Sequence, residues 1–210
     1  MSRAVLIFAR SPESEAMAKN LPLQEAVPVI RQHVAEWLSA ASMCDAAAVI
    51  ACVAADREAI AAIVPEQARL WVTQRGTAFG QRLAIAATDA FSLGFSALMI
   101  APIDVPPPAA LALAFETVEH GGNVVAPSPN GGVNLLGIRQ TDVDLLVSIQ
   151  PRQRDVVGTL RARFPRLVVL PSAPHASDLA AVCDTVDSPT PARSVASPLS
   201  LRTGRVVEEG

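Results

Sequence analysis

The chain has 210 residues, half of them hydrophobic, which is enough to form one sizeable domain with a buried core. A net charge of -3 and a pI of about 5.6 argue against nucleic acid as a partner, because nucleic-acid binders usually carry a basic face. No run of about 18 or more apolar residues indicates a membrane span, and the opening MSRAVLIFAR lacks the cleavage site of a signal peptide, so we expect a cytoplasmic protein.

Strands and helices are predicted to alternate along the chain. Apolar runs of strand length predict strands at residues 4–9, 46–54, 70–73, 96–101, 123–126, 133–138 and 167–170. Helices are predicted at residues 25–43, 57–63, 77–91, 108–120 and 155–164, and a loop at residues 11–24. Near-continuous apolar strands separated by helices are typical of an α/β fold with three layers, in which helices cover both faces of a mostly parallel sheet.

The pattern of strands and helices weakens after Pro171. We therefore expect one domain over residues 1–187, followed by a tail over residues 188–210 that is rich in Pro, Ser and Arg. An exposed edge strand and the apolar residues of the tail leave room for a homodimer.

The cysteines and histidines do not predict a metal site. Cys44, Cys52 and Cys183 lack the spacing of metal ligands, so we expect buried or inert thiols in a reducing compartment. The three histidines are scattered, and none has a histidine partner four residues away, so a zinc site is not expected.

Two isolated charges stand out. Asp104 lies between Pro102 and Pro106 just after the fourth predicted strand, and open α/β sheets bind ligands at the carboxyl ends of their strands. Lys19 is the single lysine among 17 basic residues, and a lysine ammonium is a compact point charge that arginine does not reproduce. Asp104 could also cap the following helix, and Lys19 could be an ordinary surface residue.

Three sequence segments together resemble a known family. QRGTAFGQRL, IDVPPP and APSPNGGVNLLGIR occur in the order, spacing and strand context of the bacterial DUF2064 family. That family belongs to the GT-A, or nucleotide-diphospho-sugar transferase, superfamily and is related to 2-phospholactate guanylyltransferase and the molybdenum-cofactor guanylyltransferases. The resemblance spans residues 3–170 and implies a Rossmann-like GT-A fold.

The resemblance implies a nucleotide site that Lys19 helps to form. Backbone amides and a lysine can neutralise the phosphates of a nucleotide. In this chain the Thr-Arg that follows the family lysine is replaced by Asn20-Leu21, and the family's loop glycine is absent. The positions that match the nucleotide-binding segments are Phe8, Ala9, Arg10, Lys19, Gln74, Arg75, Gly76, Gly80 and Arg82, although the arginines could be ordinary surface residues.

The resemblance also implies a divalent metal ion, Mg²⁺ or Mn²⁺, held by Asp104. Magnesium is usually bound by one or two carboxylates together with substrate phosphates. A second acidic ligand is expected near the C-terminus, at Asp187 in the sequence TVDSP or alternatively at Asp178. Either of these two acids could instead be a helix cap.

A further segment is predicted to face the acceptor substrate. Asn130, Gly131 and Gly132 match the family's Asp-Gly-Gly, with an amide in place of the acid, and Asn134 follows two residues later. The glycines permit close approach of a ligand to the backbone, but Asn-Gly is also a strong turn signal.

Two functions remain open from the sequence. The first is a metal-dependent transferase, with Lys19 and Asp104 as its catalytic residues, that uses a nucleotide sugar or a nucleoside triphosphate and a small-molecule acceptor. Glycosyl and nucleotidyl transfer are both compatible with this fold. The second is a non-catalytic nucleotide-binding module, which is favoured by Asn130 and Asn20-Leu21 because they remove charge from the site.

Overall fold

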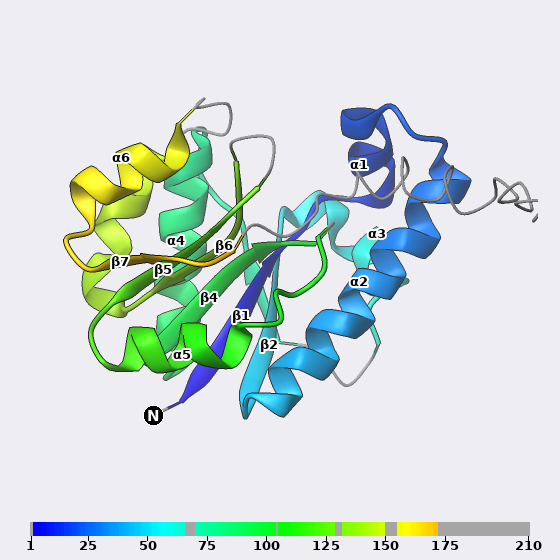
Figure 1. Ribbon diagram of the computed structural model, residues 1–210. Helices are drawn as coiled ribbons and strands as arrows, with labels where there is room; N and C mark the ends of the chain where they lie inside the picture. Colours follow the sequence, from blue (N-terminus) through cyan, green and yellow to red (C-terminus); the bar gives the residue numbers. More distant parts are fainter. Residues whose placement is uncertain (1, 66–69, 104, 129–131, 150–154, 172–210) are drawn as a thin grey trace, which may run out of the picture.

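A seven-stranded sheet forms the centre of the computed structural model, which describes residues 2–65, 70–103, 105–128, 132–149 and 155–171 (Figure 1). The predicted strands agree with the observed strands to within two residues at each end. The inner strands are apolar runs buried on both faces of the sheet, whereas the two edge strands, residues 70–73 and 167–169, are apolar but partly exposed. The strands are β1 (Arg3–Phe8), β2 (Ala46–Cys52), β3 (Leu70–Thr73), β4 (Ala97–Pro102), β5 (Asn123–Pro127), β6 (Val133–Ile138) and β7 (Leu167–Val169).

The sheet is mostly parallel, as predicted, and its strand order is β3-β2-β1-β4-β6-β5-β7. β1, β2, β3 and β4 run in the same direction, β6 is antiparallel to both β4 and β5, and β7 is parallel to β5. The strands β1, β2, β3, β4, β5 and β7 therefore all end at one edge of the sheet, which we call the carboxyl edge. The opposite edge is called the amino edge.

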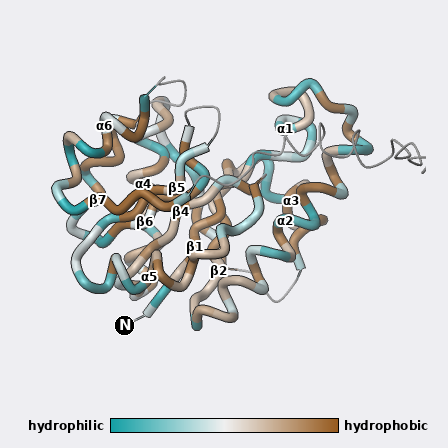
Figure 2. The backbone as a smooth tube through the Cα atoms, viewed as in Figure 1, coloured by the Kyte–Doolittle hydropathy of each residue, from teal (hydrophilic) through white to brown (hydrophobic). Residues whose placement is uncertain are grey.

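Helices cover both faces of the sheet and create two separate cores. Side chains of α2, α3 and α5 pack on one face, and side chains of α4, η3 and α6 pack on the other. The colouring by hydropathy shows the apolar strands between these amphipathic helices (Figure 2). The helices are α1 (Pro12–Lys19), α2 (Leu23–Met43), η1 (Ala54–Asp56), α3 (Arg57–Ala61), α4 (Phe79–Ser92), α5 (Leu111–Glu119), η3 (Gln140–Ser148) and α6 (Val156–Arg163), where η denotes a 3-10 helix.

The loop predicted at residues 11–24 is wrong, because this stretch contains α1 and the first turn of α2. Ser11 is the N-cap of α1, and its Oγ accepts a hydrogen bond from the Ser14 amide. Pro12 occupies the first turn, where the missing N–H costs nothing, and acidic residues near the start favour the helix through its dipole. Asn20 ends the helix in the left-handed conformation.

One other prediction needs correction, and one further helix was missed. The helix predicted from residue 108 begins at Leu111, after a turn, and the 3-10 helix η3 was not predicted at all. Residues 140–148 mix polar and apolar side chains without the spacing of an α-helix, so the pattern gave no signal for η3. Among the described residues, no helix is both long and apolar enough to cross a lipid bilayer.

Candidate functional site

The connections that follow β1, β2, β3 and β4 gather at the carboxyl edge of the sheet (Figure 1). β1 leads into α1, β2 leads into η1, and β3 leads into the turn at Gly76, whose φ of 113° is a conformation that glycine adopts without strain. β4 leads into the segment that carries Asp104. The parallel strands thus bring the predicted residues that follow β1, β3 and β4 to one side of the molecule, as an open α/β sheet does.

The connection from β1 to α1 is held by two carboxylates. The Arg10 guanidinium donates to both carboxylate oxygens of Glu15, at 2.8 and 3.3 Å. The backbone N–H of Ser11 donates to Oδ2 of Asp56 at 2.9 Å. The Arg10 charge and the Ser11 amide, which are the kinds of group that bind phosphate, are therefore both engaged within the protein.

Lys19 lies in the last turn of α1, on a helix and not in the loop that we predicted. Its side chain is half-buried, and Nζ is shielded from solvent and has an interaction partner. The α1 helix leaves the sheet at the carboxyl edge and packs beside α2. The role of Lys19 at a phosphate stays a prediction.

Gln74 ties the ends of three strands together. Its backbone N–H donates to the Cys52 carbonyl at 2.8 Å, and its side-chain amide donates to the carbonyls of Ala51 at 2.8 Å and Ala9 at 3.0 Å. The Ala9 N–H in turn donates to the Ala51 carbonyl at 2.8 Å. Since both side-chain N–H donors of Gln74 are engaged, a ligand contact by this residue would use its carbonyl oxygen. The structure thus joins two of the predicted residues, Gln74 and Ala9, directly.

The predicted residues at the start of α4 have different surroundings. The exposed Arg75 pairs with Asp89 at 2.7 Å, and Phe79 packs edge to face on Phe8 with 5.9 Å between ring centroids. Gly80 is buried against η3, where a Cβ atom would lie 2.4 Å from the Val147 carbonyl oxygen. Gly80 therefore allows two helices to approach closely, which explains this glycine without a ligand.

Arg82 follows Gly80 in the first turns of α4 and is half-buried. Among the described residues, its Nε is buried and has no hydrogen-bond partner. A buried guanidinium nitrogen without a partner is costly, so an anionic ligand that supplied an acceptor would be favoured here.

Asp104 itself lies outside the described residues, but both of its neighbours are fixed. The Ile103 N–H donates to the Phe8 carbonyl at 3.1 Å, beside the exit of β1. Nε1 of the buried Trp37 donates to the Val105 carbonyl at 2.6 Å. Ile103 and Val105 are both fully buried. The flanking backbone is thus anchored on two sides at the carboxyl edge.

The predicted acceptor residues belong to the connection between β5 and β6 and to the start of β6. Asn130 and Gly131 lie outside the described residues, whereas the Gly132 carbonyl accepts a hydrogen bond from the Ser128 amide at 2.9 Å. Asn134 is buried near the start of β6 and has a bonding partner. Because β6 is antiparallel to β4, its start also lies at the carboxyl edge.

A metal site is not complete within the described part of the chain, which contains no group of three or more His, Cys, Asp or Glu residues placed to hold an ion. The predicted ligands Asp104, Asp187 and Asp178 all lie outside it. Cys44 and Cys52 are buried free thiols, as predicted, and burial raises the pKa of each. They are therefore protonated at neutral pH and poor metal ligands.

Sequence reasoning missed Glu15 and Asp89, which pair with the predicted residues Arg10 and Arg75, and it missed Asp56, which accepts a hydrogen bond from the Ser11 amide. Asp56 could have been found by the rule that singled out Asp104, because it closely follows the end of the strand β2. The other two pairings depend on helix geometry and tertiary contacts, for which the sequence offers no signal.

The layered sheet, with its antiparallel β6 between the parallel strands β4 and β5, is an α/β fold that other solved structures share. A "putative nucleotide-diphospho-sugar transferase" of Desulfovibrio desulfuricans G20 is similar to the chain with a TM-score of 0.70 and 24% identity, over 90% of this chain and 89% of that chain. The chain belongs to the DUF2064 family, described as an uncharacterized protein conserved in bacteria, whose model matches residues 37–150.

Two more distant structures share the fold. Rv0371c of Mycobacterium tuberculosis H37Rv, solved in complex with manganese, has a TM-score of 0.51 and 14% identity, over 82% of this chain and 90% of that chain. A protein named mannose-1-phosphate geranyltransferase, from Thermus thermophilus, has a TM-score of 0.53 and 13% identity, over 82% of this chain and 75% of that chain. No curated protein matches the chain.

Proposed function

We propose that the protein is a metal-dependent transferase that uses a nucleotide sugar or a nucleoside triphosphate at the carboxyl edge of its sheet. The observation that carries the proposal is the anchoring of Ile103 and Val105, which fixes the backbone on both sides of Asp104 beside the exit of β1. A carboxylate held at this place can present hard oxygen ligands to an ion that also contacts phosphates. The likeness to nucleotide-diphospho-sugar transferases supports the same conclusion.

In this proposal each part of the carboxyl edge has a separate role. Asp104 would hold Mg²⁺ or Mn²⁺, with Asp187 or alternatively Asp178 as second ligand, and the ion would offset charge on the phosphates. Lys19 and Arg82 would bind the phosphate oxygens, since Arg82 has a buried nitrogen that lacks a partner among the described residues. Catalysis would consist of positioning and of electrostatic stabilisation of the leaving phosphate group.

The remaining predicted residues would hold the two substrates. Phe8, Ala9, Arg10, Gln74, Arg75, Gly76 and Gly80 border or support the nucleotide in this proposal. The acceptor, a small molecule with a nucleophilic oxygen, would lie near Asn130, Gly131, Gly132 and Asn134. A cytoplasmic location, a domain boundary at residue 187 and a homodimer stay predictions.

A second candidate function is a nucleotide-binding module without catalysis. The observation that favours it is the internal pairing of groups that would otherwise bind phosphates. Arg10 pairs with Glu15, Arg75 pairs with Asp89, and the Ser11 amide binds Asp56. Each pair must open, or accept a second partner, before its N–H donors can bind a ligand.

The two functions can be separated by thermal unfolding with GTP, ATP or UDP-glucose, each with and without Mg²⁺ or Mn²⁺. Ligand at about 100 times its Kd should raise the melting temperature by roughly 5–10 °C. For the transferase, this rise needs the ion and is lost in Asp104→Asn. It is retained in the control Asp45→Asn, which changes an exposed carboxylate at the amino edge.

Release of nucleoside diphosphate or pyrophosphate from the nucleotide that stabilises the protein would then establish the reaction. Stabilisation without an ion, and without product release, would favour the binding module. A melting temperature that no nucleotide changes would contradict both functions.

A further inference from the structure

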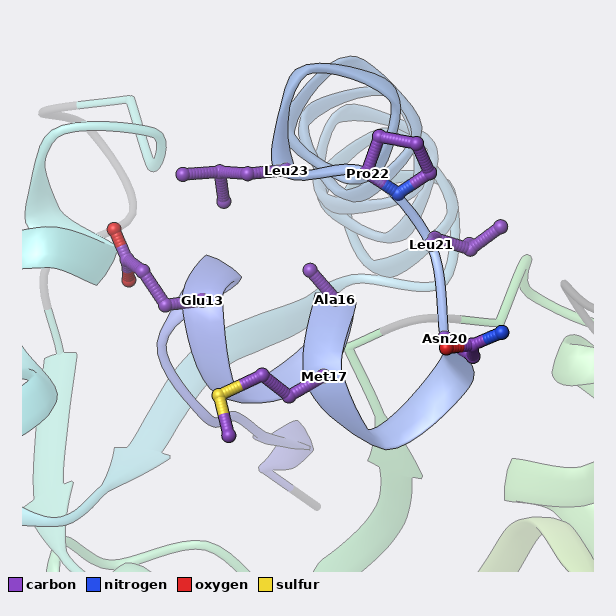
Figure 3. Close-up of a pocket in the computed structure, with 7 residues that line it drawn as sticks. All are labelled: Glu13, Ala16, Met17, Asn20, Leu21, Pro22 and Leu23. Atoms are coloured by element: carbon purple, nitrogen blue, oxygen red, sulfur yellow. The ribbon is translucent and has the colours of Figure 1, made fainter.

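A groove between α1 and α2 lies beside the candidate site and is not used by it. It has a volume of about 650 Å³ and is lined by Glu13, Ala16, Met17, Asn20, Leu21, Pro22 and Leu23. Figure 3 shows the side chains of Glu13, Met17 and Leu23 extending to the same side of the hollow, with Ala16 at its centre. The groove thus has an apolar floor and an acidic residue at its rim.

The apolar side chains of this groove are unusually open to solvent. Met17 is 82% exposed and Leu23 is 41% exposed. Single exposed apolar residues are ordinary, but apolar residues that together line a concave surface mark binding sites.

The C-terminal part of the chain has the composition that this groove requires. Residues 188–207 contain three arginines, Arg193, Arg202 and Arg205, and no acidic residue. The apolar residues Leu199 and Leu201 alternate with serine directly before Arg202. This stretch therefore offers apolar side chains for the floor of the groove and positive charge for Glu13 at its rim.

The geometry of the sheet allows the tail to reach the groove. The described chain ends at Pro171, just after β7, and β7 and β1 both end at the carboxyl edge. These two strands are separated by β4, β6 and β5, a distance of about 19 Å at the usual strand spacing. The residues between Pro171 and Leu199 would span roughly 29 Å even as a random coil, and far more when extended.

We propose that the groove between α1 and α2 is the docking site of the chain's own residues 196–205. Attachment to the same chain raises the effective concentration of the segment to the millimolar range, so a weak contact suffices for occupancy. The docked segment covers Met17 and Leu23 and holds α1, the helix that carries Lys19. This inference does not depend on the proposed nucleotide chemistry.

Disulfide trapping in the full-length protein tests the proposal. Cys183 is first replaced by Ser, and the two remaining cysteines, Cys44 and Cys52, are buried. Met17→Cys with Leu199→Cys should form an intramolecular disulfide at least about tenfold faster than the control pair Leu93→Cys with Leu199→Cys. Leu93 is 51% exposed at the end of α4, which runs from the carboxyl edge to the amino edge.

A second measurement does not require a disulfide. In full-length Met17→Cys, the thiol should react faster with a labelling reagent when Leu199 and Leu201 are both replaced by Ser. Equal trapping rates for the two pairs, or a labelling rate that these two replacements leave unchanged, would overturn the proposal. Disulfides that form only between molecules, at a rate that rises with protein concentration, would assign the groove to a second copy of the chain instead.

Discussion

The two edges of the sheet use arginine in opposite ways. At the amino edge, Arg3 donates to both carboxylate oxygens of Glu119, at 2.8 and 2.7 Å, and to the Cys44 carbonyl at 3.1 Å. The Arg3 guanidinium also lies 5.4 Å from the ring centroid of Phe115. The side chains of this pair are only 23% and 17% exposed, so the charge is enclosed by fixed partners.

At the carboxyl edge two arginines stay open to solvent. Arg10 and Arg75 are 56% and 60% exposed, although each forms an ion pair. The Arg75–Asp89 pair is the more exposed of the two and contributes only about 0–1 kcal/mol to stability, so a ligand phosphate can replace Asp89 at little cost. Displacement of Arg10 would cost more, because the Glu15 carboxylate is buried. The amino edge thus has an enclosed ion pair, whereas Arg75 at the carboxyl edge has a charge that can change partners.

Replacement of Gly80 by Ala gives the largest expected effect and tests how rigidly the carboxyl edge is supported. The new Cβ would collide with the backbone carbonyls of Leu146 and Val147, which a side-chain rotation cannot relieve. We expect a loss of about 3 kcal/mol in the free energy of unfolding, measured by urea denaturation. Gly132→Ala is the control, because its nearest contact is an ordinary 3.8 Å from Ser128. A neutral Gly80→Ala would show that η3 moves freely against α4.

Replacement of Trp37 by Phe is expected to have the next largest effect. It removes the donor to the buried Val105 carbonyl and should cost about 2 kcal/mol in stability. If this bond positions Asp104, stabilisation by nucleotide and metal should fall as well. Trp71→Phe is the matched control, since Trp71 is half-buried and stacks under Arg57. If nucleotide and metal stabilise Trp37→Phe as much as they stabilise the unchanged protein, the hydrogen bond from Trp37 to Val105 does not position Asp104.

The sequence predicts the strands of the sheet but not the contacts that Gly80 and Trp37 make. The strands were predicted to within two residues, and the inner strands gave the clearest signal because burial on both faces requires uninterrupted apolar runs. Asp104 was placed at a strand end for the same reason, and Ile103 and Val105 confirm the position of the flanking chain. The contacts of Gly80 and Trp37 could not be predicted, because they join residues 67 or 68 positions apart and depend on how the layers pack.

The helix α1 was missed for a different reason. The prolines in residues 11–24 favoured a loop, although Ser11 before Pro12 is itself a helix-start signal. The Asp56 bond to the Ser11 amide spans 45 residues and could not be predicted locally. Part of the charge balance at the candidate site is therefore set by tertiary contacts.

The pair at the amino edge should make stability depend on pH. Hydrogen bonds from Arg3, and its positive charge, hold the pKa of Glu119 below its ordinary value of 4.5. The pair therefore stabilises the fold fully above about pH 4.5, and this contribution is lost as the pH falls through the lower folded-state pKa. Glu119→Gln should cost about 1 kcal/mol at pH 7 and flatten the pH dependence of urea unfolding below pH 4.5.

Glu58→Gln, which changes an exposed glutamate on α3, is the control for that experiment and should change the free energy of unfolding at pH 7 by less than about 0.5 kcal/mol. If Glu119→Gln and the unchanged protein lose stability in parallel on acidification, the Arg3–Glu119 pair contributes no more to stability than an exposed ion pair. The contrast between an enclosed pair at the amino edge and an exposed pair at the carboxyl edge would then fail.

Variants of the Arg75–Asp89 pair should have the smallest effect on stability. They test whether Arg75 can exchange its carboxylate partner for a phosphate. Asp89→Asn removes the charge that holds Arg75, and both Asp89→Asn and Arg75→Ala should change the free energy of unfolding by less than about 0.5 kcal/mol. If Arg75 binds phosphate, nucleotide affinity should rise about threefold in Asp89→Asn and fall about fivefold in Arg75→Ala, a difference of roughly 1 kcal/mol in either direction.

The double variant distinguishes competition from a general change in charge. With Arg75 absent, removal of the Asp89 charge should no longer raise affinity beyond a small long-range effect, because the two residues act through one contact. Arg161→Ala, in the last turn of α6, controls for the loss of one positive charge away from the carboxyl edge. Equal affinities in Arg75→Ala and Arg161→Ala, measured by titration calorimetry, would make Arg75 an ordinary surface arginine and leave Lys19 and Arg82 as the cations for the phosphates.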